Sequence, residues 1–191
     1  MEAPTPTRCV ALLTSDGTSV RCPLDVFETG FKDVAKSLKD CSEDGELDLS
    51  SPITLAKIER EEELLHCIRF IQTLMNRKVD FEMKRLGTTE DYYFPRERLA
   101  EQMWFYDEIR AIDDDRWQNA SPKPPQPFEL LHRILLAFHF IDSSGLCYRV
   151  GTHYFANQLI TPIAKQPDGP QRLREAFCLP NDLPKDMETE E

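Results

Sequence analysis

The chain opens with the pattern of a β-hairpin. The apolar residues 10–13 and the alternating residues 19–22 flank the dipeptide Asp16-Gly17, which is typical of a tight turn between antiparallel strands. A third short strand is expected at residues 47–49, where two leucines alternate with an aspartate and Pro52 marks the end or the edge of the strand. The sequence therefore predicts a small N-terminal sheet.

Helical spacing dominates the rest of the chain. Apolar residues recur every three or four positions, and this recurrence predicts helices at residues 24–29, 31–39, 58–76, 96–112, 128–141, 146–160 and 170–177. The segment 128–141 is the most apolar and is expected to be the central helix, whereas Pro162 is expected to end the helix before it. A small sheet followed by many helices indicates a mostly helical α+β fold.

Residues 77–118 give the weakest pattern. They are charged, and the proline-rich stretch 121–127 that follows them predicts a stiff, extended linker. Their aromatic side chains favour packing within the chain over a partner surface, although aromatic residues dominate both environments. These aromatic residues are Tyr92, Tyr93, Phe94, Trp104, Phe105, Tyr106 and Trp117.

Charge and cysteine spacing narrow the function classes. The 191 residues include 34 acidic and 23 basic side chains, which gives a formal net charge of −11. Without a basic cluster to neutralise phosphates, neither a nucleic acid nor an anionic membrane is an expected partner. No apolar run is long enough to span a bilayer, and the N-terminus has no signal-peptide pattern. The six cysteines lack a C-x-x-C pair, which favours reduced thiols and a location in the cytoplasm and nucleus.

The chain carries few signs of catalysis. It has no glycine-rich phosphate loop and no nucleophile-elbow or zinc-protease motif. A zinc site or a Cys–His nucleophile could be formed by His132, His139, Cys147 and His153. The favoured interpretation is that these residues are polar groups that are partly buried or lie at an interface. The run Asp113-Asp114-Asp115 is expected to be a solvated acidic helix end rather than a cation site. We therefore expect no enzyme activity, no cofactor and no metal.

Four segments carry a resemblance to a known family. They are LTSDG at 13–17, LLAFHFIDSSGL at 135–146, FANQLI at 155–160 and PQRLREAFCLPNDL at 170–183. In this order they resemble the S-phase kinase-associated adaptor family, which contains the F-box-binding subunits of SCF-type cullin ubiquitin ligases. Elongin C shares the fold but lacks the last pattern. The resemblance covers about residues 8–76 and 128–184.

The resemblance implies a BTB/POZ fold with a C-terminal helical extension. Residues 8–160 would form the BTB/POZ-like domain, with a divergent insertion at about 77–127, and residues 161–191 would form the extension and an acidic tail. The implied function is a non-enzymatic adaptor that binds an F-box-type protein and joins it to a cullin. By correspondence, the F-box-binding residues would be Phe140, Val150, Tyr154, Phe155, Leu159, Leu173, Phe177 and Leu179.

The implied cullin-facing residues are His139 and Phe140, which stand where the family has an Asn-Tyr pair. Phenylalanine keeps the ring but loses the hydroxyl, and histidine changes the donor geometry. By the same correspondence, the family's final helix is expected to be missing. These differences motivate the alternative of a structural scaffold, which would use the POZ and helical surface for a dedicated assembly partner without binding a cullin. The residues leave open whether the POZ surface forms a homodimer.

Overall fold

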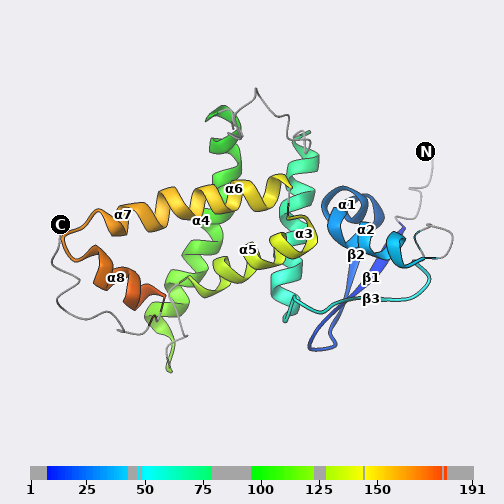
Figure 1. Ribbon diagram of the computed structural model, residues 1–191, viewed down its shortest axis with the longest axis horizontal. Coiled ribbons are helices and arrows are strands. Elements are labelled where there is room, and N and C mark those ends of the chain that lie inside the picture. The colour runs from blue at the N-terminus through cyan, green and yellow to red at the C-terminus, as the bar shows by residue number, and fades with distance from the viewer. Residues whose placement is uncertain are drawn as a thin grey trace, which may run out of the picture.

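The computed structural model describes residues 8–42, 47, 49–78, 96–122, 128–143, 145–177 and 179. Within these residues the chain has a mixed α+β architecture, mostly helical, with one three-stranded sheet. The sheet and the first two helices lie at one end of the molecule, and the last two helices lie at the other end (Figure 1). The expected α+β class is confirmed.

The predicted hairpin is present. Strands β1 (Cys9–Thr14) and β2 (Ser19–Pro23) pair antiparallel, with Leu12 opposite Val20. Gly17 has a φ of 87°, a left-handed conformation that glycine adopts at little cost. Asp16 fixes the turn because its Oδ1 atom accepts hydrogen bonds from the Thr14 hydroxyl at 2.5 Å and from the Thr18 N–H at 3.0 Å.

The third strand lies elsewhere than expected. Strand β3 is Ile53–Leu55, and it pairs parallel to β1 with Ile53 opposite Leu12, so the sheet order is β2-β1-β3. The prediction of a strand at residues 47–49 is wrong, because the described residues Leu47 and Leu49 belong to no strand. Burial explains why the third strand forms at residues 53–55. Ile53 and Leu55 lie on the face that packs on the core, while Thr54 faces solvent.

Two helices connect the second strand to the third, and another helix follows the third strand. Helix α1 spans Leu24–Gly30, α2 spans Lys32–Cys41, and α3 spans Glu61–Asn76. The helix expected from residue 58 thus begins three residues later. Residues 59 and 60 stay extended, and their N–H groups donate to the Glu63 side chain at 3.1 and 3.4 Å, which caps the first turn of α3.

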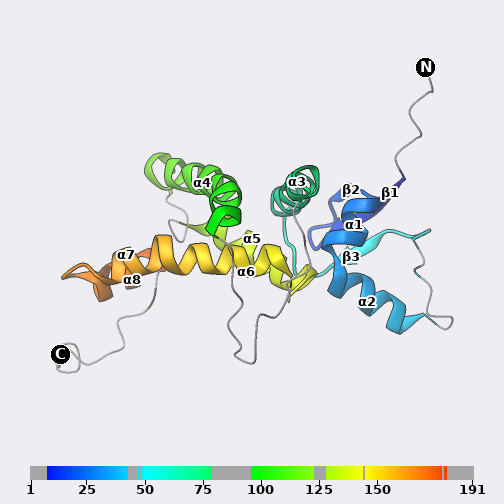
Figure 2. The ribbon, with the colours of Figure 1, turned by 90° about the horizontal axis from the view of Figure 1, so that it is seen from above.

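The remaining helices form the larger part of the molecule. Helix α4 runs over Arg96–Asn119, seven residues beyond its predicted end, and α5 over Glu129–Ile141. A second long helical segment consists of α6 (Leu146–Tyr154), a π-helical turn η1 (Phe155–Ile160) and α7 (Thr161–Ala164), which follow one another without a break (Figure 2). It crosses the predicted domain boundary at residue 160. Pro162 does not end it, because proline is tolerated in the first turn of α7. Helix α8, Gly169–Ala176, then folds back.

Aromatic rings in the core connect helices α3, α4 and α5. Phe70 of α3 lies 5.2 Å from Tyr106 of α4 and 5.5 Å from Phe138 of α5, measured between ring centroids. Tyr106 is fully buried, as the preference for packing anticipated, and Trp117 is half-buried. The side chains of the other aromatic residues between 92 and 105, and most of the predicted linker 121–127, lie outside the described residues.

Candidate protein-binding surface

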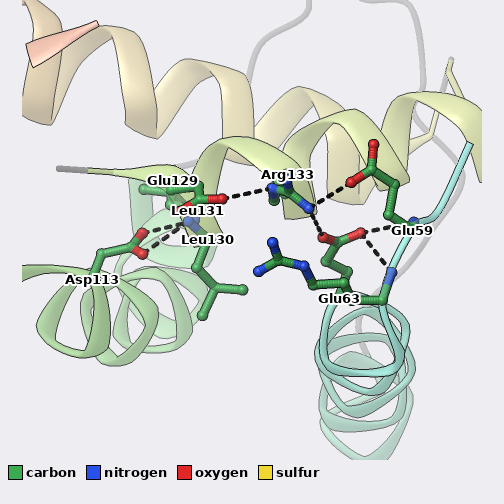
Figure 3. A network of polar contacts seen from close by, with 8 residues as sticks. Glu59, Glu63, Asp113, Glu129, Leu130, Leu131 and Arg133 are labelled. Carbon is green, nitrogen blue, oxygen red and sulfur yellow. Dashed lines mark hydrogen bonds and ion pairs between the residues drawn. The ribbon is translucent and has the colours of Figure 1, made fainter. Parts of the chain in front are cut away.

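Helix α5 is held at its start by an aspartate of α4. The Asp113 carboxylate accepts hydrogen bonds from the N–H groups of Leu130 and Leu131, both at 2.8 Å (Figure 3). These N–H groups belong to the first turn of α5 and have no partner within the helix. Burial raises the pKa of Asp113 to about 6, although both N–H donors and Arg116 favour its charged form. The expectation that the whole acidic run is solvated is therefore wrong for Asp113, while Asp114 and Asp115 are exposed.

Helix α5 is also tied to α3 through one arginine. Arg133 Nη1 donates to Glu59 at 2.9 Å and to Glu63 at 2.8 Å, and its Nε lies 3.1 Å from Glu129 (Figure 3). The Glu63 side chain is only 5% exposed, so its charge depends on this guanidinium and on the two N–H donors at the start of α3. The network fixes where α5 lies relative to α3.

We expect Arg133→Ala to lower the free energy of unfolding by about 2 kcal/mol, because Glu63 loses its countercharge while it remains buried. The half-exposed setting of Arg133 keeps the loss below that of a fully buried pair. The matched control is Arg172→Ala, which breaks the exposed 2.6 Å pair between Arg172 of α8 and Asp168, the residue before α8. Urea unfolding should show a change below about 0.5 kcal/mol for this control. Equal losses in both variants would contradict the role of Arg133.

Helices α5 and α6 form an antiparallel hairpin with a close crossing at Gly151. A Cβ atom at this position would lie 2.3 Å from Leu135 Cδ2 and 2.5 Å from the Tyr106 hydroxyl. That hydroxyl donates to the Cys147 carbonyl at 3.1 Å, so Tyr106 links α4 to α6 at the same point. The glycine lets the two helices approach, and their outer faces form one surface.

An aromatic cluster lies at the end of this hairpin away from the sheet. Phe155, the first residue of η1, lies 6.4 Å from Phe128, 6.5 Å from His132 and 5.8 Å from Phe177, measured between ring centroids. Phe155 and Phe177 are both half-buried. Burial lowers the pKa of His132, and Arg133 adds to this effect, so the ring is neutral at neutral pH. The cluster joins α5, η1 and α8 in a partly exposed apolar surface.

The structure separates the predicted F-box-binding residues into two groups. Val150, Tyr154 and Leu159 are buried within the chain's own core, and the Tyr154 hydroxyl donates to Asp107 of α4. The other five are accessible. Phe140, Phe155, Leu173 and Phe177 are half-buried, and Leu179 is 56% exposed. The structure brings Phe155 and Phe177 together, and it places Phe140 on α5, outside their ring contacts.

The two predicted cullin-facing residues differ in accessibility. His139 is exposed, and its ring lies 4.8 Å from that of Tyr148 on α6. Phe140 is half-buried and packs against the hydrophobic core. His139 is therefore the more accessible of the two residues.

The F-box-binding residues expected from the sequence leave out three residues of this surface, of which His132 was considered only as a polar group at an interface or partly buried. Phe128 and His132 contact Phe155, and Leu136 is 52% exposed on the outer face of α5. The apolar pattern of residues 128–141 covers most of a helix circumference, so it does not show which side faces outward. The sequence offered one signal for the outward side: His132, Leu136 and Phe140 follow one another at a spacing of four residues, which makes them neighbours on a helix surface.

The residues considered for zinc binding or nucleophilic catalysis are not brought together as one site. In the described part of the chain, no three His, Cys, Asp or Glu side chains are grouped so that they could hold a metal ion. His132 and His139 contact different aromatic rings, and Cys147 is buried. Burial raises the pKa of the Cys147 thiol, which disfavours the nucleophilic thiolate.

Comparison with known proteins adds no assignment. The chain matches no family model and no curated protein. Among the described helices, none is both long and apolar enough to cross a bilayer. The partly exposed apolar surface at the C-terminal helices is thus the feature on which a function can be argued.

Proposed function

We propose that this chain is a non-enzymatic adaptor subunit that binds an F-box-type protein through its C-terminal helices and joins it to a cullin ubiquitin ligase in the cytoplasm and nucleus. The observation that carries the proposal is the contact between the half-buried rings of Phe155 and Phe177, which connects η1 to the end of α8. Aromatic anchors of this kind carry much of the binding energy when helices dock in grooves.

The element order gives the proposal further support. Two strands, two helices and a third strand precede the central helices, as expected of the BTB/POZ fold implied by the sequence resemblance. In this proposal, residues 8–160 form the BTB/POZ-like domain. The accessible residues Phe155, Leu173 and Phe177, together with the exposed Leu179, then form the F-box-binding surface.

We expect Phe177→Ala to weaken binding of an F-box protein by about 2 kcal/mol, a roughly 30-fold loss, because it removes a central aromatic anchor. The control is Ile112→Ala, which truncates a similarly accessible apolar residue on α4. Isothermal titration calorimetry with the F-box proteins that co-purify with the chain measures the loss, and circular dichroism confirms that both variants are folded. Unchanged affinity in a folded Phe177→Ala variant would refute this surface.

One observation favours a second function, a structural scaffold that does not bind a cullin. His139 and Phe140 replace the family's Asn-Tyr pair, and Phe140 packs on the core without a hydroxyl to offer. A cullin binding assay separates the two functions. Tight cullin binding supports the ligase adaptor, whereas binding of one dedicated partner without a cullin supports the scaffold.

A further inference from the structure

The outer face of the α5–α6 hairpin carries a continuous row of partly exposed side chains. His139 contacts Tyr148 at one end of the row, and His132 contacts Phe155 at the other. Because the helices are antiparallel, Leu136 and Thr152 lie between these two ring pairs. We call this row the hairpin stripe: His132, Leu136, His139, Tyr148, Thr152 and Phe155.

The hairpin stripe contains no aspartate, glutamate, lysine or arginine, although the whole chain has a net charge of −11. Leu136 at its centre is 52% exposed, a large apolar exposure for a well-formed helix. His132 and His139 are seven residues apart, which corresponds to about 10 Å along α5, or two helical turns. The stripe therefore has the length and polarity to match the apolar face of another helix.

The two sides of the hairpin stripe differ in charge. The sequence from 143 to 167, which contains α6, η1 and α7, includes Arg149 and Lys165 but no aspartate or glutamate. On the α5 side, a shallow pocket of about 200 Å³ opens between the segment before α3 and α5. It is lined by Lys57, Glu59, Glu63, His132, Arg133 and Leu136, so it shares two residues with the stripe. Its glutamates bind Arg133 (Figure 3).

We propose that the hairpin stripe binds one amphipathic α-helix of a partner protein, whose apolar residues lie over Leu136 and the two ring pairs and whose acidic residues lie along α6 and α7. Charge complementarity supports an acidic flank, because residues 143–167 carry the cations Arg149 and Lys165 and no carboxylate. The pocket beside Leu136 accepts one side chain of this helix. The inference rests on the proposed function, in which these helices bind a partner, and it adds the chemistry of the partner segment.

Two synthetic peptides test the stripe on the full chain. They share the same apolar helical face, and their flanking positions are either all Glu or all Lys. Fluorescence anisotropy should show that the Glu peptide binds at least tenfold more tightly than the Lys peptide. Leu136→Glu should weaken binding of the Glu peptide at least tenfold. The control Leu65→Glu, at a residue 46% exposed on α3, should change it less than twofold.

Other results would overturn the proposal. Equal binding of both peptides, or no loss with Leu136→Glu, excludes the stripe as an acidic-helix site. Dimerisation of the parent chain that Leu136→Glu abolishes would assign the stripe to a second copy instead. Failure of the proposed function is distinguishable, since Glu-peptide binding that depends on Leu136 supports the stripe even when no F-box protein co-purifies. Conversely, F-box proteins recovered equally by parent and Leu136→Glu overturn the stripe alone.

Discussion

Phe70→Ala is expected to lower the free energy of unfolding by about 3–5 kcal/mol. Phe70 is 1% exposed and contacts Tyr106 and Phe138, so its ring joins α3 to α4 and α5. Truncation removes buried apolar area and leaves a cavity between three helices, which relax only partly because each is fixed by other contacts. Urea unfolding followed by circular dichroism measures the change.

The control for this prediction lies on the same helix. Leu65 of α3 is 46% exposed, and Leu65→Ala is expected to change the free energy of unfolding by less than about 1 kcal/mol. A similar, small effect in both variants would show that α3 does not pack on α4 and α5 as the structure has it.

Asp113→Ala is expected to lower the free energy of unfolding by about 3 kcal/mol. The carboxylate is 2% exposed and satisfies two N–H groups of α5 that are otherwise without acceptors in the helix. Its removal leaves both donors in a buried setting, and each unsatisfied group costs about 1–3 kcal/mol. It also removes a negative charge from the N-terminus of α5, where the helix dipole favours it.

Two further variants separate the hydrogen bonds from the volume of the side chain. Asp113→Asn keeps the shape, but its amide can accept at only one atom and turns a donor toward the second N–H, so most of the loss should remain. Asp114→Ala, next in sequence and exposed, should change stability by less than about 0.5 kcal/mol. An Asp113→Asn variant as stable as the parent would contradict the assigned role.

The features that could be predicted from the sequence are those determined by residues close together along the chain. The hairpin follows from Asp16-Gly17, since the turn needs a positive φ and a side-chain acceptor, both within four residues. Strand β3 was missed because three residues are too few for a pattern, and its position is fixed by pairing with β1. The last seven residues of α4 were not predicted because a run of three aspartates interrupts the apolar spacing. Asp113 is nevertheless buried there by its contacts to α5.

The candidate surface depends on contacts that spacing alone does not reveal. The resemblance assigns both Tyr154 and Phe155 to partner binding, but the structure buries Tyr154 and leaves Phe155 half-buried. Leu159 follows Tyr154 by five residues, a spacing that a regular α-helix would turn about 140° away. The π turn η1 restores Leu159 to the buried side, so both residues serve the core. Phe155, by contrast, contacts α5 and α8 and belongs to the partner-binding surface that we propose.

The most direct test of the adaptor function is a comparison of the proteins that co-purify with the tagged parent chain and with its Leu173→Ala, Phe177→Ala variant. Mass spectrometry of both preparations identifies the retained proteins. The proposed function predicts several F-box proteins and a cullin with the parent, and loss of the F-box proteins with the folded double variant. Recovery of the same F-box proteins by both chains, or of none by the parent, would contradict it.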